Sequence, residues 1–144
     1  MKAKICGLKR PEDIALINAL PHELRPEYIG FVFAPSKRQV TCIEAKTLAA
    51  HLVPTVKKAG IFVNESLEVM AKLAIAVPLD VIQLSGDETE EDIEALRQLT
   101  KAAIWKVVPV KSAADVARWR DSSADMILFD TFVKGERGRI RSKL

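Results

Sequence analysis

The side chains best able to move protons stand where predicted strands end. Cys6 closes the first apolar segment and is followed by Gly7, and Asp130 follows the late apolar residues 127–129. A thiol accepts a proton near neutral pH only where positive charge or hydrogen-bond donors lower its pKa. Position alone leaves a second interpretation of Cys6 open, because free cysteines are often small buried core residues. Cys42 lies at the start of a predicted helix, and we expect it to be a small core residue of this kind.

Other polar residues also follow predicted strands. The segment APSKRQ at residues 34–39 and Asn64 come after strands, the segment QLSGDE at residues 83–88 lies around the end of a strand, and Lys106 lies near the end of another. Functional residues of parallel α/β folds gather at such positions. No GxGxxG follows the first strand, and His22 and His51 are isolated, so the sequence predicts neither a dinucleotide site nor a metal site.

The elements that must position these residues alternate along the chain. Segments rich in Val, Ile and Phe predict strands, and most are apolar almost throughout, as in strands buried on both faces of a parallel sheet. Helical periodicity separates them, with capping-box spacing at three helix starts. The predicted strands are residues 3–6, 28–33, 59–63, 79–84, 103–108 and 125–129, and the capping pairs are Thr41–Glu44, Thr89–Asp92 and Ser112–Asp115.

Six strands and five helices are compatible with two architectures. An open doubly wound sheet closes naturally at five or six strands, whereas a (β/α)8 barrel needs about 200 residues at about 25 residues per unit. The chain has 144 residues, so length alone favours the open sheet.

Composition predicts a cytoplasmic protein with one core. The first residues carry Lys2 and Lys4 without an apolar segment behind them, and no apolar stretch approaches the ~20 residues of a membrane span. The net charge of +3 comes from residues 134–144, since the rest of the chain has 17 basic and 18 acidic residues. We therefore expect no membrane and no nucleic-acid partner.

Five motifs, each at a strand end, resemble those of the phosphoribosylanthranilate isomerase family of tryptophan biosynthesis. The resemblance covers residues 2–138 and implies the (β/α)8 barrel, against the open sheet. The motifs are KICGLKRPEDI, GFVFAPSKRQV, AGIFVNES, VIQLSGDE and ILFDT, in this order.

The resemblance implies an Amadori rearrangement. N-(5-phosphoribosyl)anthranilate, an aminoaldose, becomes the aminoketose 1-(2-carboxyphenylamino)-1-deoxyribulose 5-phosphate. The family's general base matches Cys6, and its general acid, which must hold a proton for the sugar ring oxygen, matches Asp130. No cofactor is expected, because the substrate's own amine is the electron sink.

The same resemblance implies a substrate site. Arg38 matches the arginine that binds the anthranilate carboxylate, and Gln83 and Gly7 are further candidates for contact with the phosphosugar. Lys37 is expected to be solvated. Ser85 departs from the family, which usually has histidine in this position.

The sequence departs further from the family pattern after residue 138. We expect residues 1–138 to form a partial barrel, with βα units 1–5 and strand 6, and residues 139–144 to be an atypical basic tail. The open edges of such a sheet predict self-association and little activity for the chain by itself.

Two other functions compete with the isomerase. Another phosphate-binding barrel enzyme of amino-acid biosynthesis, such as indoleglycerol-phosphate synthase, needs a pair of lysines at strand ends and gives Cys6 no role. A non-catalytic fragment with a nucleic-acid-binding tail has few aromatic residues near that tail for stacking on bases.

Overall fold

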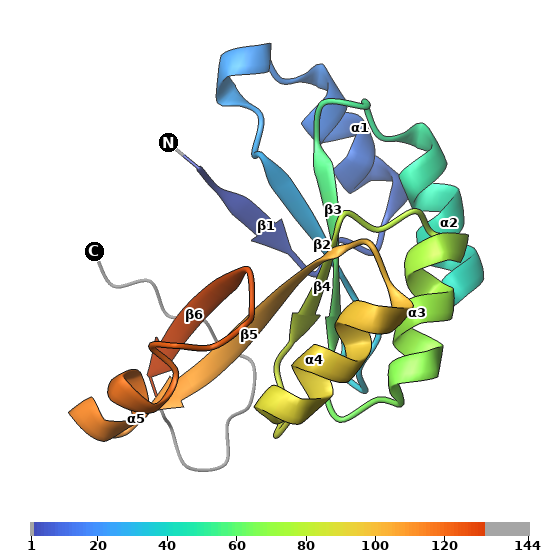
Figure 1. Ribbon diagram of the computed structural model, residues 1–144. Coiled ribbons are helices and arrows are strands. Elements are labelled where there is room, and N and C mark those ends of the chain that lie inside the picture. Colours follow the sequence, from blue (N-terminus) through green and yellow to red (C-terminus); the bar gives the residue numbers. More distant parts are fainter. Residues whose placement is uncertain (1, 132–144) are drawn as a thin grey trace.

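The computed structural model describes residues 2–131, which form one parallel sheet flanked by helices (Figure 1). The predicted pattern of six strands and five helices is confirmed within these residues. The strands are β1 (Lys4–Cys6), β2 (Tyr28–Val32), β3 (Lys57–Phe62), β4 (Val81–Leu84), β5 (Ala103–Val110) and β6 (Met126–Thr131). The helices are α1 (Pro11–Ala19), α2 (Cys42–His51), α3 (Leu67–Ala76), α4 (Glu90–Leu99) and α5 (Ala113–Arg118), with a 3-10 turn at His22–Leu24.

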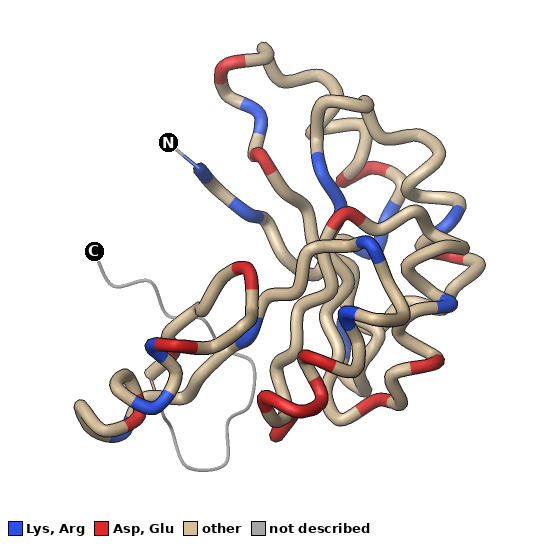
Figure 2. The backbone as a smooth tube through the Cα atoms, in the orientation of Figure 1, with Lys and Arg blue, Asp and Glu red and all other residues tan. Residues whose placement is uncertain are grey.

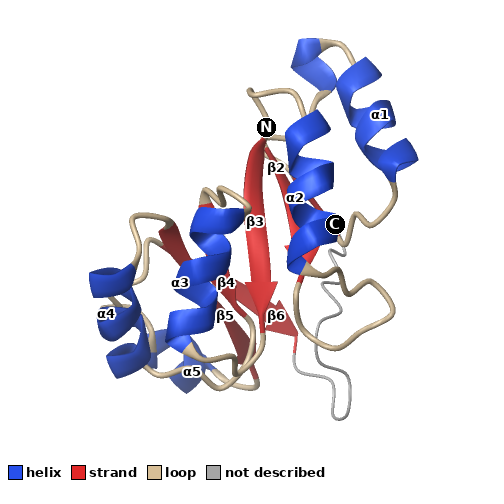
Figure 3. Ribbon diagram, turned by 90° about the vertical axis from the view of Figure 1, so that its right-hand side faces the viewer, coloured by secondary structure: helices blue, strands red, loops and turns tan. Residues whose placement is uncertain are grey.

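Strand order decides between the two architectures. The strands pair in sequence order, from β1 to β6, and every pair is parallel. Right-handed crossovers that always move to the next strand place their helices on one side of the sheet, whereas a doubly wound sheet reverses direction and covers both faces. Helices α1 to α4 lie together on one side (Figures 1 and 3). The described chain is therefore an open part of a barrel.

All six strands differ from their predicted bounds by one or two residues, and β5 and β6 each extend two residues further than predicted. β6 continues through Thr131, so Asp130 lies inside the strand and does not follow it. β5 continues to Val110, so Lys106 lies in the middle of its strand. Both strands extend beyond their predicted ends because β5 and β6 pair without interruption up to Val110 and Thr131.

Helix starts are well specified by the sequence. At α2 and α4 the hydroxyls of Thr41 and Thr89 accept hydrogen bonds from backbone amides three residues later, and the carboxylates of Glu44 and Asp92 accept from the capping residues' own amides. These predicted capping boxes are confirmed. Three acidic residues in the first turn of α4 interact favourably with the positive end of the helix dipole. Figure 2 shows this concentration of negative charge.

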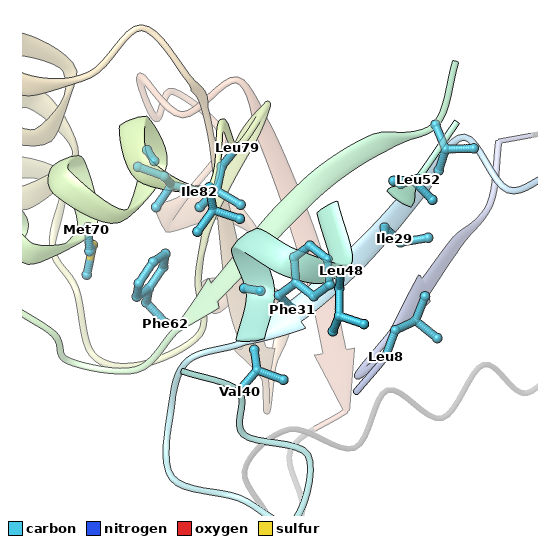
Figure 4. Close-up of a cluster of buried hydrophobic side chains, with 14 of the residues drawn as sticks. Leu8, Ile29, Phe31, Val40, Leu48, Leu52, Phe62, Met70, Leu79 and Ile82 are labelled. Carbon is cyan, nitrogen blue, oxygen red and sulfur yellow. The ribbon is translucent and has the colours of Figure 1, made fainter. Parts of the chain in front are cut away.

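The main core lies between the strands and the helices (Figure 4). Alternate strand residues such as Phe31, Phe62 and Ile82 point to this side and are fully buried against Leu48 of α2 and Met70 of α3. A smaller apolar cluster covers the opposite face of the sheet, which we call the inner face. It contains Ala59, Val81 and Trp105, with Tyr28, Ala103 and Leu128 packed against it.

No helix in the described part of the chain combines the length and the apolar character that crossing a membrane requires.

Candidate active site

Strand register places Cys6 and Asp130 on the same face of the sheet. Cys6 is paired with Gly30, and Gly30 is paired with Ala59, a member of the inner cluster. Asp130 lies two residues beyond Leu128, which packs on that cluster, so both point to the inner face. Each is near the carboxyl end of its strand, where barrel active sites form.

Gly30 makes room for the thiol. A Cβ atom at Gly30 would lie 3.2 Å from Cys6 Sγ and 2.7 Å from Ile61 Cδ1. Its carbonyl oxygen also accepts hydrogen bonds from the amides of Gly7 (2.9 Å) and Leu8 (3.3 Å), which anchors the loop after β1. The sequence alone did not reveal this role, because it depends on the pairing of β1 with β2.

Gly7 allows Arg38 to cross the same loop. Its φ of +82° lies in the region that favours glycine, and an added Cβ would stand 2.4 Å from Arg38 Cδ and 3.2 Å from Arg38 Nη1. The loop after β2 carries Arg38, whose amide donates to Ser36 Oγ at 3.1 Å. The structure thus brings three of the predicted site residues, Cys6, Gly7 and Arg38, into one group.

Two opposing effects act on the ionisation of Cys6. Burial is the larger and raises the pKa of the thiol above its ordinary value. The Lys4 ammonium, the Arg38 guanidinium and a hydrogen bond from the Gly7 amide lower this pKa and partly offset the burial. A thiolate at Cys6 therefore depends on the positive groups around it.

Gln83 lies on the inner face, and its side-chain amide is hydrogen-bonded to two other side chains. It is 3% exposed, its Oε1 accepts a hydrogen bond from Lys4 Nζ, and its Nε2 donates to Ser85 Oγ at 3.1 Å. Ser85, the departure from the family pattern, is thus part of a chain of polar side chains that crosses from β4 to β1.

Side-chain alternation along β6 determines which residues surround Asp130. Its neighbour Phe129 points to the other face of β6 and is 52% exposed, so it does not shield the carboxyl group. Leu128 and Met126 share the inner face with Asp130, and Pro109 is its partner in β5. Asp130 itself is partly buried.

Lys106 belongs to a different arrangement, on the helix side. It lies two residues after Ile104, a member of the main core, and its Nζ donates to Glu88 Oε2 at 2.9 Å and to the Gly86 carbonyl at 2.7 Å. Glu88 also accepts from the amides of Asn64 and Gly86, each at 2.9 Å. This buried ion pair fastens the loops after β3 and β4, beside a hollow of about 330 Å³.

Within residues 2–131, no three His, Cys, Asp or Glu side chains come together as metal ligands.

A parallel sheet in barrel order, with ionisable side chains on its inner face near the carboxyl ends of the strands, defines a protein of the (β/α)8-barrel class. The sequence model of the family described as "N-(5'phosphoribosyl)anthranilate (PRA) isomerase" matches residues 3–140. The chain belongs to this family.

Similar proteins agree with this assignment. The N-(5'-phosphoribosyl)anthranilate isomerase of Clostridium acetobutylicum is 41% identical over 138 residues, which are 96% of this chain and 64% of that protein. The Bacillus subtilis protein of the same name is 39% identical over 137 residues, 94% of this chain and 61% of the relative. This chain thus spans somewhat under two thirds of the length of these relatives.

Solved structures show the same fold. The phosphoribosyl anthranilate isomerase of Thermotoga maritima matches with a TM-score of 0.83 and 32% identity, over 96% of this chain and 65% of that one. A structure of the isomerase in complex with reduced 1-(o-carboxyphenylamino)-1-deoxyribulose 5-phosphate matches with a TM-score of 0.79 and 34% identity, over 92% and 66%.

The buried ion pair leads to a stability prediction. Glu88→Gln leaves the Lys106 ammonium buried without a countercharge and should lower the free energy of unfolding by about 3 kcal/mol. Adding Lys106→Met should recover much of this loss, because the remaining side chain carries no charge. Chemical denaturation measures both, with exposed Glu91→Gln as the control. A Glu88→Gln variant as stable as the parent would show that the pair does not hold the loops.

Proposed function

We propose that this chain provides the catalytic acid and base of a phosphoribosylanthranilate isomerase. The observation that carries the proposal is the position of Cys6 and Asp130 on one inner face, at the carboxyl ends of strands at opposite edges of the sheet. Arg38 lies at the same end, beside Cys6. Membership of the family and the phosphosugar derivative bound in a related structure support the same substrate class.

The proposed reaction needs two proton transfers before the final tautomerisation. Asp130 gives a proton to the ring oxygen of N-(5-phosphoribosyl)anthranilate, the bond from that oxygen to C1 breaks, and the nitrogen lone pair forms a Schiff base. Cys6, as the thiolate, then takes the proton from C2, and the electron pair moves through C1 to the nitrogen. The resulting enolamine gains a proton at C1, loses the proton of its C2 hydroxyl and becomes the aminoketose.

Arg38 suits the aromatic end of this substrate. A guanidinium presents two parallel N–H donors to a carboxylate, which fixes the plane of the anthranilate as well as its position. The exposed Arg38 side chain crosses the loop that follows Cys6, so a carboxylate bound there would bring the sugar towards the thiol. Gln83 and Gly7 remain predicted substrate contacts, and a cytoplasmic location remains a prediction from the sequence.

Replacement of either proton-transfer group should reduce turnover. Cys6→Ala and Asp130→Asn should each lower kcat by about 100-fold or more with a small change in KM, because each removes one proton transfer. Since burial raises the pKa of Cys6, parent kcat/KM should also rise with pH above neutrality. Steady-state fluorescence assays of an enzyme with all eight βα units measure these values, with Cys42→Ala as the control. A Cys6→Ala enzyme with normal kcat would assign the base elsewhere.

Arg38→Lys tests the carboxylate contact separately. Lysine keeps the charge and loses the planar pair of donors, which should weaken binding by about 1–3 kcal/mol and raise KM about 5- to 150-fold. The adjacent exposed Lys37→Met is the matched control and should leave KM unchanged. Equal KM values for Arg38→Lys and the parent would remove Arg38 from the site.

Self-association is a further part of the proposal. Among the described residues, β1 and β6 each pair with only one strand, and Ile5 and Phe129 on these strands are 42% and 52% exposed. Unpaired strand edges with apolar side chains favour pairing with a second copy. A related isomerase from Thermotoga maritima is itself described as dimeric.

Sedimentation velocity checks this prediction. The chain should sediment as a species larger than its 15.9 kDa monomer, and Phe129→Lys should weaken the association by placing a charge at the β6 edge. Ile43→Lys, on the exposed side of α2, is the matched control and should leave it unchanged. A monodisperse monomer at micromolar concentration would contradict the proposal.

A further inference from the structure

Lys4 shares the inner face with the proposed catalytic thiol. It stands two residues before Cys6 on β1, so both side chains leave the strand on the same side. Its register partner is Tyr28, which packs against the inner apolar cluster. A lysine that points towards the interior of a barrel must be held there by polar partners, because a charged group is costly to bury.

The partners of Lys4 lie on β4 and β5. Lys4 Nζ donates a hydrogen bond to Gln83 Oε1 on β4 and lies 5.7 Å from the centre of the Trp105 ring on β5. The Gln83 Nε2 donates in turn to Ser85 Oγ. Because an ammonium can only donate, it fixes the Gln83 amide with Oε1 towards Lys4, and the Ser85 hydroxyl oxygen accepts from the other end of the amide.

The ammonium and the thiol affect each other's ionisation. Burial lowers the pKa of Lys4, and the negative charge of an ionised Cys6 counteracts this effect. Conversely, Lys4 is the charged group that most strongly opposes the effect of burial on the pKa of Cys6, followed by Arg38. Arg38 lies exposed and is screened by water and salt, whereas Lys4 is mostly enclosed.

Other elements around Cys6 contribute little charge. The residue opposite it on β2 is Gly30, and Gln83 from β4 is neutral. Lys57, one strand beyond Tyr28 in the same register row, is exposed and lies near Glu27 at 4.0 Å. Asp130 shares the inner face from the distant edge strand β6.

We propose that Lys4 is a positioning residue that acts through Cys6: its enclosed ammonium, held by Gln83, stabilises the thiolate needed as the base. The inference rests on the proposed function only for the use of that thiolate in catalysis. It also gives Ser85 a role in this chain, as the acceptor for the Nε2 of the Gln83 amide that binds Lys4.

The test measures thiolate formation directly. In a Cys42→Ser background, the rate of Cys6 alkylation by iodoacetamide is followed by mass spectrometry from about pH 6.5 to 9.5. Lys4→Met should move the rate profile to higher pH and lower the rate at pH 8 by a factor of about three or more. Lys4→Arg should restore most of the parent profile, because it keeps the charge.

Matched variants separate this effect from a general loss of charge or of packing. Lys57→Met removes a lysine from the same row of the sheet and should leave the Cys6 profile unchanged. Gln83→Leu keeps Lys4 but removes its acceptor, so it should shift the profile in the same direction by a smaller amount. This variant also tests the proposal if Lys4→Met does not fold, as judged by circular dichroism.

Three results would overturn the inference: an unshifted profile in folded Lys4→Met, an equal shift in Lys57→Met, or an unshifted profile in folded Gln83→Leu. Failure of the proposed function is recognised separately. A Cys6→Ala enzyme with normal turnover would refute catalysis by Cys6, while the alkylation profile would still report whether Lys4 controls the thiol.

Discussion

The in-register pairing of parallel strands is the constraint on which the site depends. Because side chains alternate across each strand, one set of residues packs with the helices and the other faces the interior of the barrel. Cys6 and Asp130 come from the first and last described strands, yet continuous pairing through four intervening strands assigns them to the same face. A shift of one residue in any pair would turn polar site groups towards the helix core and apolar core residues towards the site.

Burial and charge oppose each other at the thiol. The narrow space beside Gly30 encloses Cys6 and favours the neutral form, while Lys4, Arg38 and the Gly7 amide favour the thiolate. Glycines at positions 7 and 30 permit this close arrangement, since any side chain there would meet Arg38 or the sulfur itself. The geometry of the site thus depends on the small size of Gly7 and Gly30 as well as on the charged groups.

Local patterns predicted most of the fold. Capping pairs such as Thr89–Asp92 and apolar strand segments act over a few residues, so they are readable in the sequence. The partners of Lys4 and Lys106 could not be predicted, because Gln83 is 79 residues from Lys4 and Glu88 is 18 residues from Lys106. The end of β6 was misjudged for a related reason: whether Asp130 continues the strand depends on its pairing with β5. Resemblance to the family supplied the proposed roles of Cys6 and Asp130, which position alone left open.

The most direct test of the account is a crystal structure of this chain with reduced 1-(o-carboxyphenylamino)-1-deoxyribulose 5-phosphate, the ligand bound in a related isomerase. We expect its carboxylate to meet the Arg38 guanidinium, and its second sugar carbon to lie within about 4 Å of Cys6 Sγ, with the Asp130 carboxyl group on the sugar oxygens. A ligand bound on the helix side, or on the inner face away from Cys6 and Asp130, would contradict the assignment of these two residues as the catalytic pair.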